Sequence, residues 1–282
     1  MQLALLTCLT MTAFAANSVL TRMAIDGGHI DPSGFAIVRV AAGALVLGMI
    51  LSLRGGGLPL LRRARVPGAL SLTLYMISFT LAYLTLDAGL GALILFGVVQ
   101  IAMFTHTALS GGVLTTRQLT GAGVAFAGLL IALWPGPGGA ADPVGAALMV
   151  LAGLGWAAYT INGRTAGDPL AATAANFLLC LPLVLVLLVG TGLTYTATGV
   201  ALGILCGGLT SGLGYALWYR VLAGISGPTA AILQLSVPII AILAGALILG
   251  EAVGLVLILA TVLVIGGIGW AITSQSAPEG RS

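Results

Sequence analysis

Charged residues are scarce in this sequence. Asp, Glu, Lys and Arg together make up 6% of the 282 residues, whereas hydrophobic residues make up 59%. A soluble domain carries about 25% charged residues, so this chain has too few polar side chains to cover a surface in water. Apolar stretches of about 20 residues, the length of helix that crosses a bilayer, recur along the whole chain. The sequence therefore predicts an all-α membrane protein that crosses the bilayer many times.

Lysine is absent, and only two histidines and three cysteines are present. The basic residues are arginines scattered among short loops, so the pI of about 9.0 does not indicate nucleic-acid binding. The cysteines have no metal-binding or redox spacing, and no His-Glu-x-x-His motif or nucleotide-binding loop occurs. We expect no metal, no cofactor and no enzymatic or ATP-driven activity.

Breaks at Gly, Pro, Asp and Arg divide the chain into ten expected membrane helices. Their expected ranges are 3–24, 33–53, 67–86, 89–110, 116–135, 143–163, 171–190, 197–219, 228–250 and 252–273. Arginines gather in one set of alternate loops, and acidic residues gather in the other set. Loops rich in arginine stay in the cytoplasm. We therefore expect a multi-pass protein of the cell (inner) membrane with both termini cytoplasmic.

One sequence pattern occurs twice. FAANSVLTR at 14–22 and WAAYTINGR at 156–164 both place two alanines after an aromatic residue and an arginine eight places after it. The sequence thus predicts two five-helix repeats, residues 1–135 and 143–273, followed by a short cytoplasmic tail, residues 274–282. Because five is odd, the second repeat enters the membrane from the opposite side. Such inverted repeats are typical of secondary transporters with a central cavity, because the two halves can open alternately.

Several residues carry a resemblance to a known family. They are an Asn-Ser pair in the first helix, Pro32 followed by Phe35 and Arg39 in the second, and the run from Ala230 through Pro238 to Glu251. These features resemble the drug/metabolite transporter superfamily of the EamA type, over essentially the whole chain. Within it, the chain is similar to the aromatic amino acid exporters of the YddG type. The resemblance implies a ten-helix carrier.

A bend is expected in the ninth helix. Pro238 has no N–H group, so the carbonyl of Gln234, four residues earlier, loses its helical partner. A free carbonyl and a side-chain amide would then meet near the bilayer midplane, where transporter sites are commonly built from interrupted helices. The alternative is a packing kink satisfied by a neighbouring Ser or Thr.

Aromatic side chains recur at comparable depth in several predicted helices and favour a pocket for a flat apolar substrate with a polar end. They are Tyr75, Phe79, Tyr83, Tyr159 and Tyr215. Asn17, which aligns with Tyr159, would offer an amide from the opposite half. Trp156, Trp218 and Tyr219 lie nearer the expected helix ends and are interpreted as residues of the membrane interface.

Arg39 and His106 are candidates for gating or coupling. Arg39 lies about six residues into its helix, where a charge at full depth costs about 2.5–3.5 kcal/mol. Its functional interpretation is contact with a carboxylate or another anion. We favour a buried arginine that bonds carbonyl groups or reaches Asp31 or Asp26. His106 is a candidate proton relay, although a local hydrogen bond is the commoner role.

No Asp or Glu lies well inside a predicted span, so a buried carboxylate for proton or sodium coupling is lacking. We expect a non-ATP carrier that exports amino acids, aromatic ones first, or related small metabolites by facilitated alternating access. The alternatives are a proton-coupled carrier for another metabolite or drug class, and a channel, which also uses inward-facing polar groups. The expected partners are a small-molecule substrate and the lipid bilayer, with a monomer as the working state.

Overall fold

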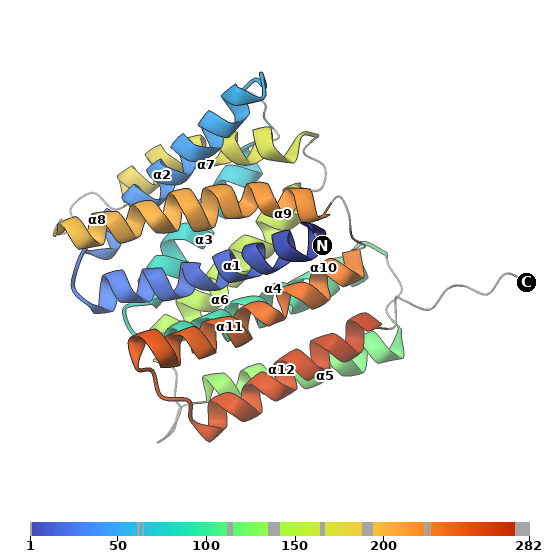
Figure 1. Cartoon of the computed structure of the whole chain (residues 1–282). Helices are drawn as coiled ribbons and strands as arrows, with labels where there is room; N and C mark the ends of the chain where they lie inside the picture. The colour runs from blue at the N-terminus through green and yellow to red at the C-terminus, as the bar shows by residue number, and fades with distance from the viewer. Residues whose placement is uncertain are drawn as a thin grey trace, which may run out of the picture.

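A computed structural model describes residues 2–60, 63, 65–111, 115–134, 142–163, 167–187, 194–222, 225 and 227–273. Over these residues the chain is all-helical (Figure 1). The first half consists of α1 (Gln2–Asp26), α2 (Pro32–Leu53), α3 (Arg65–Ala82), α4 (Ala88–Leu109) and α5 (Thr116–Leu133). The predicted tail, 274–282, and the predicted helix ends at 135 and 188–190 lie outside the described residues.

The second half contains two irregular rods. It begins with α6 (Pro143–Gly163) and α7 (Pro169–Leu187). The first rod runs through α8 (Ala197–Ile204), the π-helical segment η1 (Leu205–Leu213) and α9 (Gly214–Leu222). The second runs through α10 (Gly227–Gln234), α11 (Ser236–Ala244) and the π-helical segment η2 (Gly245–Leu249), and α12 (Leu255–Thr273) ends the half.

Helix ends follow from local chemistry. Asp31 caps α2: its carboxylate accepts a hydrogen bond of 3.0 Å from the Gly34 N–H, and Pro32 occupies the first turn. Thr115 and Gln118 form a capping box at the start of α5. The ends of α3 differ most from prediction, since this helix spans Arg65–Ala82 instead of 67–86.

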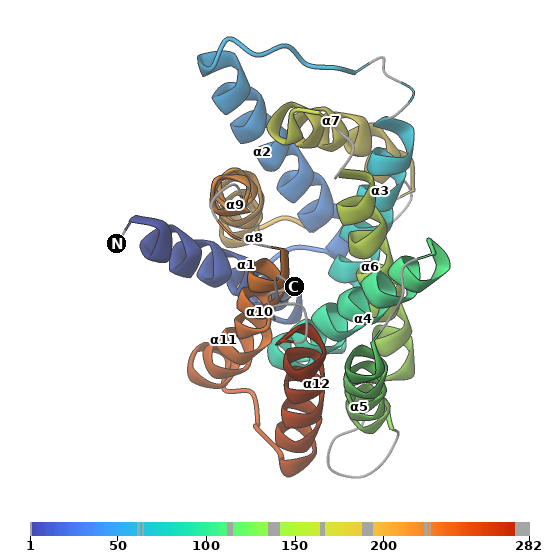
Figure 2. The ribbon, with the colours of Figure 1, turned by 90° about the vertical axis from the view of Figure 1, so that its right-hand side faces the viewer.

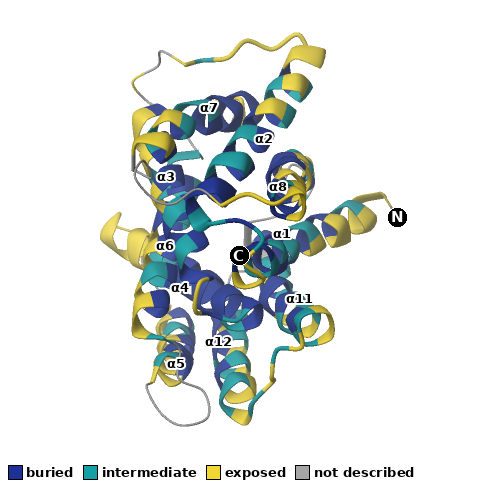
Figure 3. Cartoon of the chain, turned by 90° about the vertical axis from the view of Figure 1, so that its left-hand side faces the viewer, coloured by how far each residue is buried: buried dark blue, intermediate teal, exposed yellow. Residues whose placement is uncertain are grey.

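Nine helical segments among the described residues are long and apolar enough to cross a membrane. The segment that falls outside this set is α3, in which Arg65, Ser71, Thr73, Ser78 and Thr80 reduce the apolar character. Large apolar side chains such as Leu45 and Leu247, 74% and 84% exposed, point outward from the bundle. Figure 3 shows buried residues in the interior and exposed ones on the outer helix faces. These features indicate a multi-pass membrane protein.

The two halves pack against each other throughout the bundle. α2 lies against α7, α4 against α11, and α5 against α12 (Figures 1 and 2). α3 packs on α6, and α1 packs on η1 and α9. α1 and α4 lie between the α2–α7 pair at one edge and the α5–α12 pair at the other (Figure 2). The centre of the bundle is therefore formed by both halves.

Close helix contact at this centre depends on glycine. Gly207 of η1 lies so near the Arg39 backbone of α2 that an added Cβ would collide with the Arg39 carbonyl oxygen. Small residues permit such approach between helices in lipid. The contact fixes the depth and direction of Arg39 relative to η1.

Candidate functional site

Arg39 is the largest fully buried side chain in the described part of the chain. It lies where α1, α2, α3 and η1 meet. Its Nη2 donates hydrogen bonds to Asn17 Oδ1 at 3.3 Å and to the Tyr75 hydroxyl at 3.1 Å, and its Nε donates to Ser211 Oγ at 3.4 Å. Its Nη1 is buried and has no hydrogen-bond partner. The guanidinium group is thus held by neutral acceptors with one donor group left over.

Arg39 is buried, as the favoured interpretation predicts, but its hydrogen-bond partners are neutral side chains, and the expected contacts with Asp31 and Asp26 are absent. Asp31 instead accepts hydrogen bonds at the start of α2 and from the Thr194 N–H at 2.9 Å, and Asp26 pairs with Arg22 at 3.2 Å. The only ion pairs found among the described residues involve Arg22, so Arg39 has no acidic partner there. A buried charge left without its counter-charge costs about 3–5 kcal/mol. The site therefore holds an uncompensated positive charge.

Aromatic rings surround the guanidinium group. Its central carbon lies 4.8 Å from the Phe79 ring centroid and 5.5 Å from that of Tyr75. These distances are typical of cation–π contacts, which offset part of the burial cost. Tyr75 in turn packs against Trp156 at 5.0 Å, and Trp156 packs against Tyr215 at 5.1 Å between ring centroids. Rings from both halves thus form one continuous aromatic cluster.

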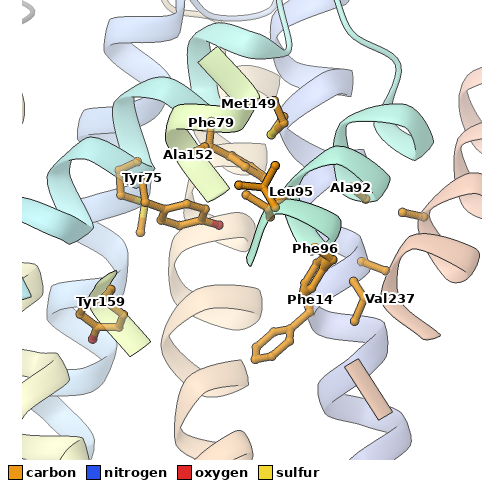
Figure 4. Close-up of a cluster of buried hydrophobic side chains, with 14 of the residues drawn as sticks. Phe14, Tyr75, Phe79, Ala92, Leu95, Phe96, Met149, Ala152, Tyr159 and Val237 are labelled. Carbon is orange, nitrogen blue, oxygen red and sulfur yellow. The ribbon is translucent and has the colours of Figure 1, made fainter. Parts of the chain in front are cut away.

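A small cavity of about 20 Å³ lies inside this cluster. It is lined by Phe14, Asn17, Ser18, Tyr75, Phe79, Leu95, Phe96, Trp156 and Tyr215. Figure 4 shows Phe79 and Leu95 side by side, with Phe14 next to Phe96. The volume is enough for about one water molecule. This conformation is closed at the centre, and a larger ligand requires the rings to move apart.

Asn17 connects the cavity to the π-helical segment. Its Oδ1 lies within hydrogen-bond distance of Thr210 Oγ1 (2.7 Å), Ser211 Oγ (3.1 Å) and Cys206 Sγ (3.3 Å), besides Arg39. All three of these donors come from η1. Wide π-helical turns are frequent at functional sites because they direct additional side chains to one face. Here the wide turn supplies the polar wall behind Arg39.

Four of the predicted substrate residues meet at this cavity: Asn17, Tyr75, Phe79 and Tyr215. Tyr83 and Tyr159 do not line the cavity, but each packs against a residue that does. Tyr83 packs edge-on against Phe79 with ring centroids 4.9 Å apart, and Tyr159 stacks on Trp156 and hydrogen bonds with Thr173 at 3.0 Å. Figure 4 shows Tyr159 set apart from Phe79 and Leu95.

The predicted break in the ninth helix is present. α10 ends at Gln234, a turn follows at Leu235, and α11 begins at Ser236. The Ser236 hydroxyl donates to the Leu233 carbonyl at 2.6 Å, not to that of Gln234. Neither Gln234 nor Pro238 lines the central cavity. His106 is exposed in the last turn of α4 and is also outside the cavity.

The sequence interpretation of two tryptophans is wrong. Trp156 lines the cavity, and Trp218 is buried edge-on against Phe14 with centroids 5.8 Å apart, so neither side chain points outward as an interface residue would. The side chain of Tyr219 lies outside the described part of the structure. A signal for Trp156 was present, because it opens the second copy of the repeated pattern and Phe14 opens the first. Both opening residues line the cavity. No comparable sequence pattern indicated that Ser211 or Thr210 belongs to the site.

A second polar cluster lies at the end of the bundle where α1 ends and α4 begins. Arg22 pairs with Asp26 at 3.2 Å, as its spacing predicts, and with Asp87 at 3.7 Å. Its Nη1 also donates to the Tyr83 carbonyl at 3.0 Å. Arg22, Asp26 and Asp87, with Glu251 and His29, line a cavity of about 520 Å³. Arg22 therefore ties α1 to the connection between α3 and α4.

Glu251 joins the two halves at this polar end. Gly250 adopts a left-handed conformation (φ 70°), which glycine favours, and this reverses the chain toward α4. The Ala88 N–H donates to Glu251 Oε1 at 2.7 Å and the Gly89 N–H donates to Oε2 at 3.4 Å. Asp87 precedes α4 without making such a bond itself. A carboxylate of the second half thus caps a helix of the first.

Comparison with known proteins identifies the family. The profile of the EamA-like transporter family matches residues 143–273. An uncharacterized protein of Pseudomonas aeruginosa is 44% identical over 273 residues, which cover 94% of this chain and 92% of that protein. The chain belongs to the EamA-like transporter family. The family description names its members as transporters, and the apolar helices of this chain are long enough to cross a membrane, so the protein is a membrane transporter.

The fold is also similar to a solved structure. A crystal structure of another protein matches this EamA-like chain with a TM-score of 0.68 at 17% sequence identity. The match covers 96% of this chain and 97% of the other. At this identity the similarity shows the fold alone. The family resemblance of the sequence is confirmed, and the narrower similarity to aromatic amino acid exporters stays a prediction.

Proposed function

We propose that the protein is a secondary carrier of the cell (inner) membrane that exports aromatic amino acids or related small metabolites by alternating access. The observation that carries this proposal is the central aromatic cavity beside Arg39. Its lining comes from α1, α3 and α4 of the first half and from α6 and α9 of the second. A site enclosed by both halves is exposed to either side when the halves rock against each other. The proposed coupling is facilitated transport down the substrate gradient.

The proposal includes ten spans arranged as two inverted repeats, with α3 as the tenth. Helix pairing supports it: α2 packs on α7, α4 on α11 and α5 on α12, each with the helix that holds the same place in the other half. The contact of α3 with α6 corresponds to that of η1 and α9 with α1. This pattern is expected of two halves related by a twofold axis. Both termini then lie on the cytoplasmic side.

The test is transport by the purified protein in liposomes. We expect saturable uptake of aromatic amino acids and counterflow, in which unlabelled substrate inside drives entry of labelled substrate. Tyr75→Ala and Trp156→Ala should reduce uptake by about tenfold or more, because each removes a cavity wall. Trp134→Ala, at a position 72% exposed, is the matched control. Tyr83→Ala and Gln234→Ala test the residues outside the cavity.

The possible outcomes separate the alternatives. Uptake that rises linearly with concentration and shows no counterflow would indicate a channel. Transport of another class of metabolite, with aromatic amino acids ignored, would overturn the substrate assignment. The closed centre argues against an open pore in this conformation.

A proton-coupled carrier is the second candidate, favoured by Glu251. This carboxylate is half-buried at the junction of the two halves, so protonation would change a contact between them. Uptake driven by an imposed proton gradient, and lost in Glu251→Gln, would support coupling. His106 is the weaker candidate because it is exposed at the end of α4.

A further inference from the structure

The charge balance of the central site bears on which ligand it accepts. Arg39 is the charged side chain directly behind the cavity wall, where it contacts the lining residues Asn17, Tyr75 and Phe79. The side chains that accept its hydrogen bonds, Asn17, Tyr75 and Ser211, are neutral. The acidic residues within the described ranges all lie at helix ends: Asp26, Asp31, Asp87, Asp142, Asp168 and Glu251. Glu279 lies outside the described residues. The described site thus has one positive charge and no negative charge.

We infer that the ligand best matched to this site is an aromatic monocarboxylate that carries no ammonium group. This inference rests on the proposed function, since it names the substrate class of the same cavity. A carboxylate forms strong charge-assisted hydrogen bonds with a guanidinium group. Arg39 has a fully buried Nη1 without a partner, and its Nη2 partners Asn17 and Tyr75 line the cavity. A ligand of net charge −1 neutralises the site.

The ammonium group of an amino acid has no acidic partner there. Asn17 Oδ1 already faces Arg39 and the donors of η1. The other side-chain groups of the lining that can accept a hydrogen bond are the hydroxyls of Ser18, Tyr75 and Tyr215. A zwitterion has no net charge, so it leaves the Arg39 charge uncompensated and places a second cation near it. The amino acid should therefore bind more weakly than the same molecule without its ammonium group.

The aromatic part of the ligand follows from the remaining lining. Phe14, Phe79, Phe96 and Trp156 present ring faces and edges around the cavity. A planar ring packs well among such groups and gains from offset or edge-on contacts. The cavity lining therefore complements the ring, and Arg39, directly behind Asn17 and Tyr75, complements the carboxylate.

Four phenyl compounds of similar size distinguish the effect of the ligand's carboxylate on binding from that of its ammonium group. They are 3-phenylpropionate, with a carboxylate only; phenylalanine, with both groups; phenylalaninamide, with an ammonium only; and 3-phenylpropanamide, with neither. Dissociation constants are measured by titration calorimetry on the full-length protein in detergent at about pH 6, where both carboxylates are ionised and both ammonium groups are protonated. We expect 3-phenylpropionate to bind about tenfold or more tightly than either phenylalanine or 3-phenylpropanamide, and phenylalaninamide to bind most weakly.

Variants on α2 test the role of Arg39. In Arg39→Gln the preference for 3-phenylpropionate over 3-phenylpropanamide should fall about tenfold or more, while the amide binds as before. Arg54→Gln, an exposed arginine at the end of the same helix, is the matched control and should keep the preference. The ligand series on the unmodified protein tests the inference even if Arg39→Gln does not fold.

Each result has a distinct meaning. Phenylalanine binding as tightly as 3-phenylpropionate, or more tightly, would overturn the inference and leave the proposed export of aromatic amino acids standing. Equal binding of 3-phenylpropionate and 3-phenylpropanamide would overturn the role of Arg39. Absence of binding by all four compounds would overturn the inference together with the aromatic substrate class of the proposed function.

Discussion

Arg39 is a buried cation whose hydrogen-bond partners are all neutral side chains. Hydrogen bonds and ring faces make such a charge tolerable, but they supply no opposite charge. Among these partners, Asn17 can be replaced by an acidic residue of nearly the same shape, aspartate. Its Oδ1 already faces Arg39, Thr210 and Ser211, so a carboxylate oxygen in the same place would meet donors only.

Asn17→Asp should therefore supply an internal counter-charge. We expect a higher Tm, because the new carboxylate pairs with Arg39, and a loss of anion affinity of about tenfold or more, because the positive charge is already neutralised. Thermal unfolding in detergent and calorimetric titration with 3-phenylpropionate measure the two effects. An unchanged Tm together with unchanged affinity would contradict the charge balance described for the site.

Glu251 gives a pH dependence of stability. Burial raises the pKa of this carboxyl above its ordinary value of 4.5, and the charge of Asp87 adds to the rise, while the Ala88 N–H opposes it. The folded protein thus keeps this proton to higher pH than the unfolded chain does. Its contribution to stability is fully present below the ordinary pKa and is lost as pH rises through the raised value.

Thermal unfolding between about pH 4 and pH 8 tests this expectation. The Tm of the unmodified protein should fall with rising pH relative to that of Glu251→Gln, which keeps a hydrogen-bonding side chain and has no proton to lose. Parallel pH profiles for the two proteins would show that Glu251 does not titrate with a raised pKa.

The helices that meet at the site pack too closely at some glycines for a larger residue to fit. Gly207→Ala places a Cβ against the Arg39 carbonyl, which is backbone and has no rotamer by which to move away. We expect a loss of about 1–3 kcal/mol in the free energy of unfolding, as for other overpacked contacts. Gly48→Ala, on α2 where an added Cβ meets open space, should be neutral or slightly stabilising. Chemical or thermal unfolding in detergent compares them, and equal stabilities would contradict the close contact.

Most helices of the bundle were predictable because an apolar run of membrane length has few other solutions. The break after Gln234 followed from Pro238 for the same kind of reason, a missing N–H. The π-helical winding of η1 was not predictable. Residues of η1 contact Asn17 and Arg39 of other helices, and such contacts cannot be read from the local sequence of Leu205–Leu213. Ser211 was therefore missed as a partner of Arg39.

Among the candidate site residues, the aromatic ones were predictable from shared depth and spacing, as Tyr75, Phe79 and Tyr215 illustrate. Trp156 was misplaced because its distance from a helix end suggested an interface, whereas helix packing places it in the centre. The partner of Arg39 was also misjudged. Asp31 and Asp26 are near in sequence, but capping of α2 and pairing with Arg22 occupy them.

The number of membrane spans determines whether the two termini lie on the same side of the membrane, and this can be tested. In the proposed arrangement, two halves of five helices each are threaded in opposite directions, which returns the chain to the side on which it began. Epitope tags at both ends should be protected from protease in right-side-out vesicles and cleaved in inside-out vesicles. A soluble periplasmic and a cytoplasmic marker control for vesicle sealing. Tags that respond oppositely would rule out an even number of spans and the inverted repeat with it.

The π-helical winding of η1 determines how the second half tolerates the deletion of a residue within this segment. Each α-helical residue turns the chain by about 100°, and a π-helical stretch accommodates one residue more than the corresponding α-helix. Deleting a single residue between Leu205 and Leu213 would let the rod return to ordinary winding, with the part that follows kept at about its present rotation. Tyr215 and Trp218 would then still face Phe14, whereas Cys206, Thr210 and Ser211 would no longer all reach Asn17. Relatives that are one residue shorter in this stretch should therefore keep the aromatic rings of the cavity and lose part of the polar wall beside them.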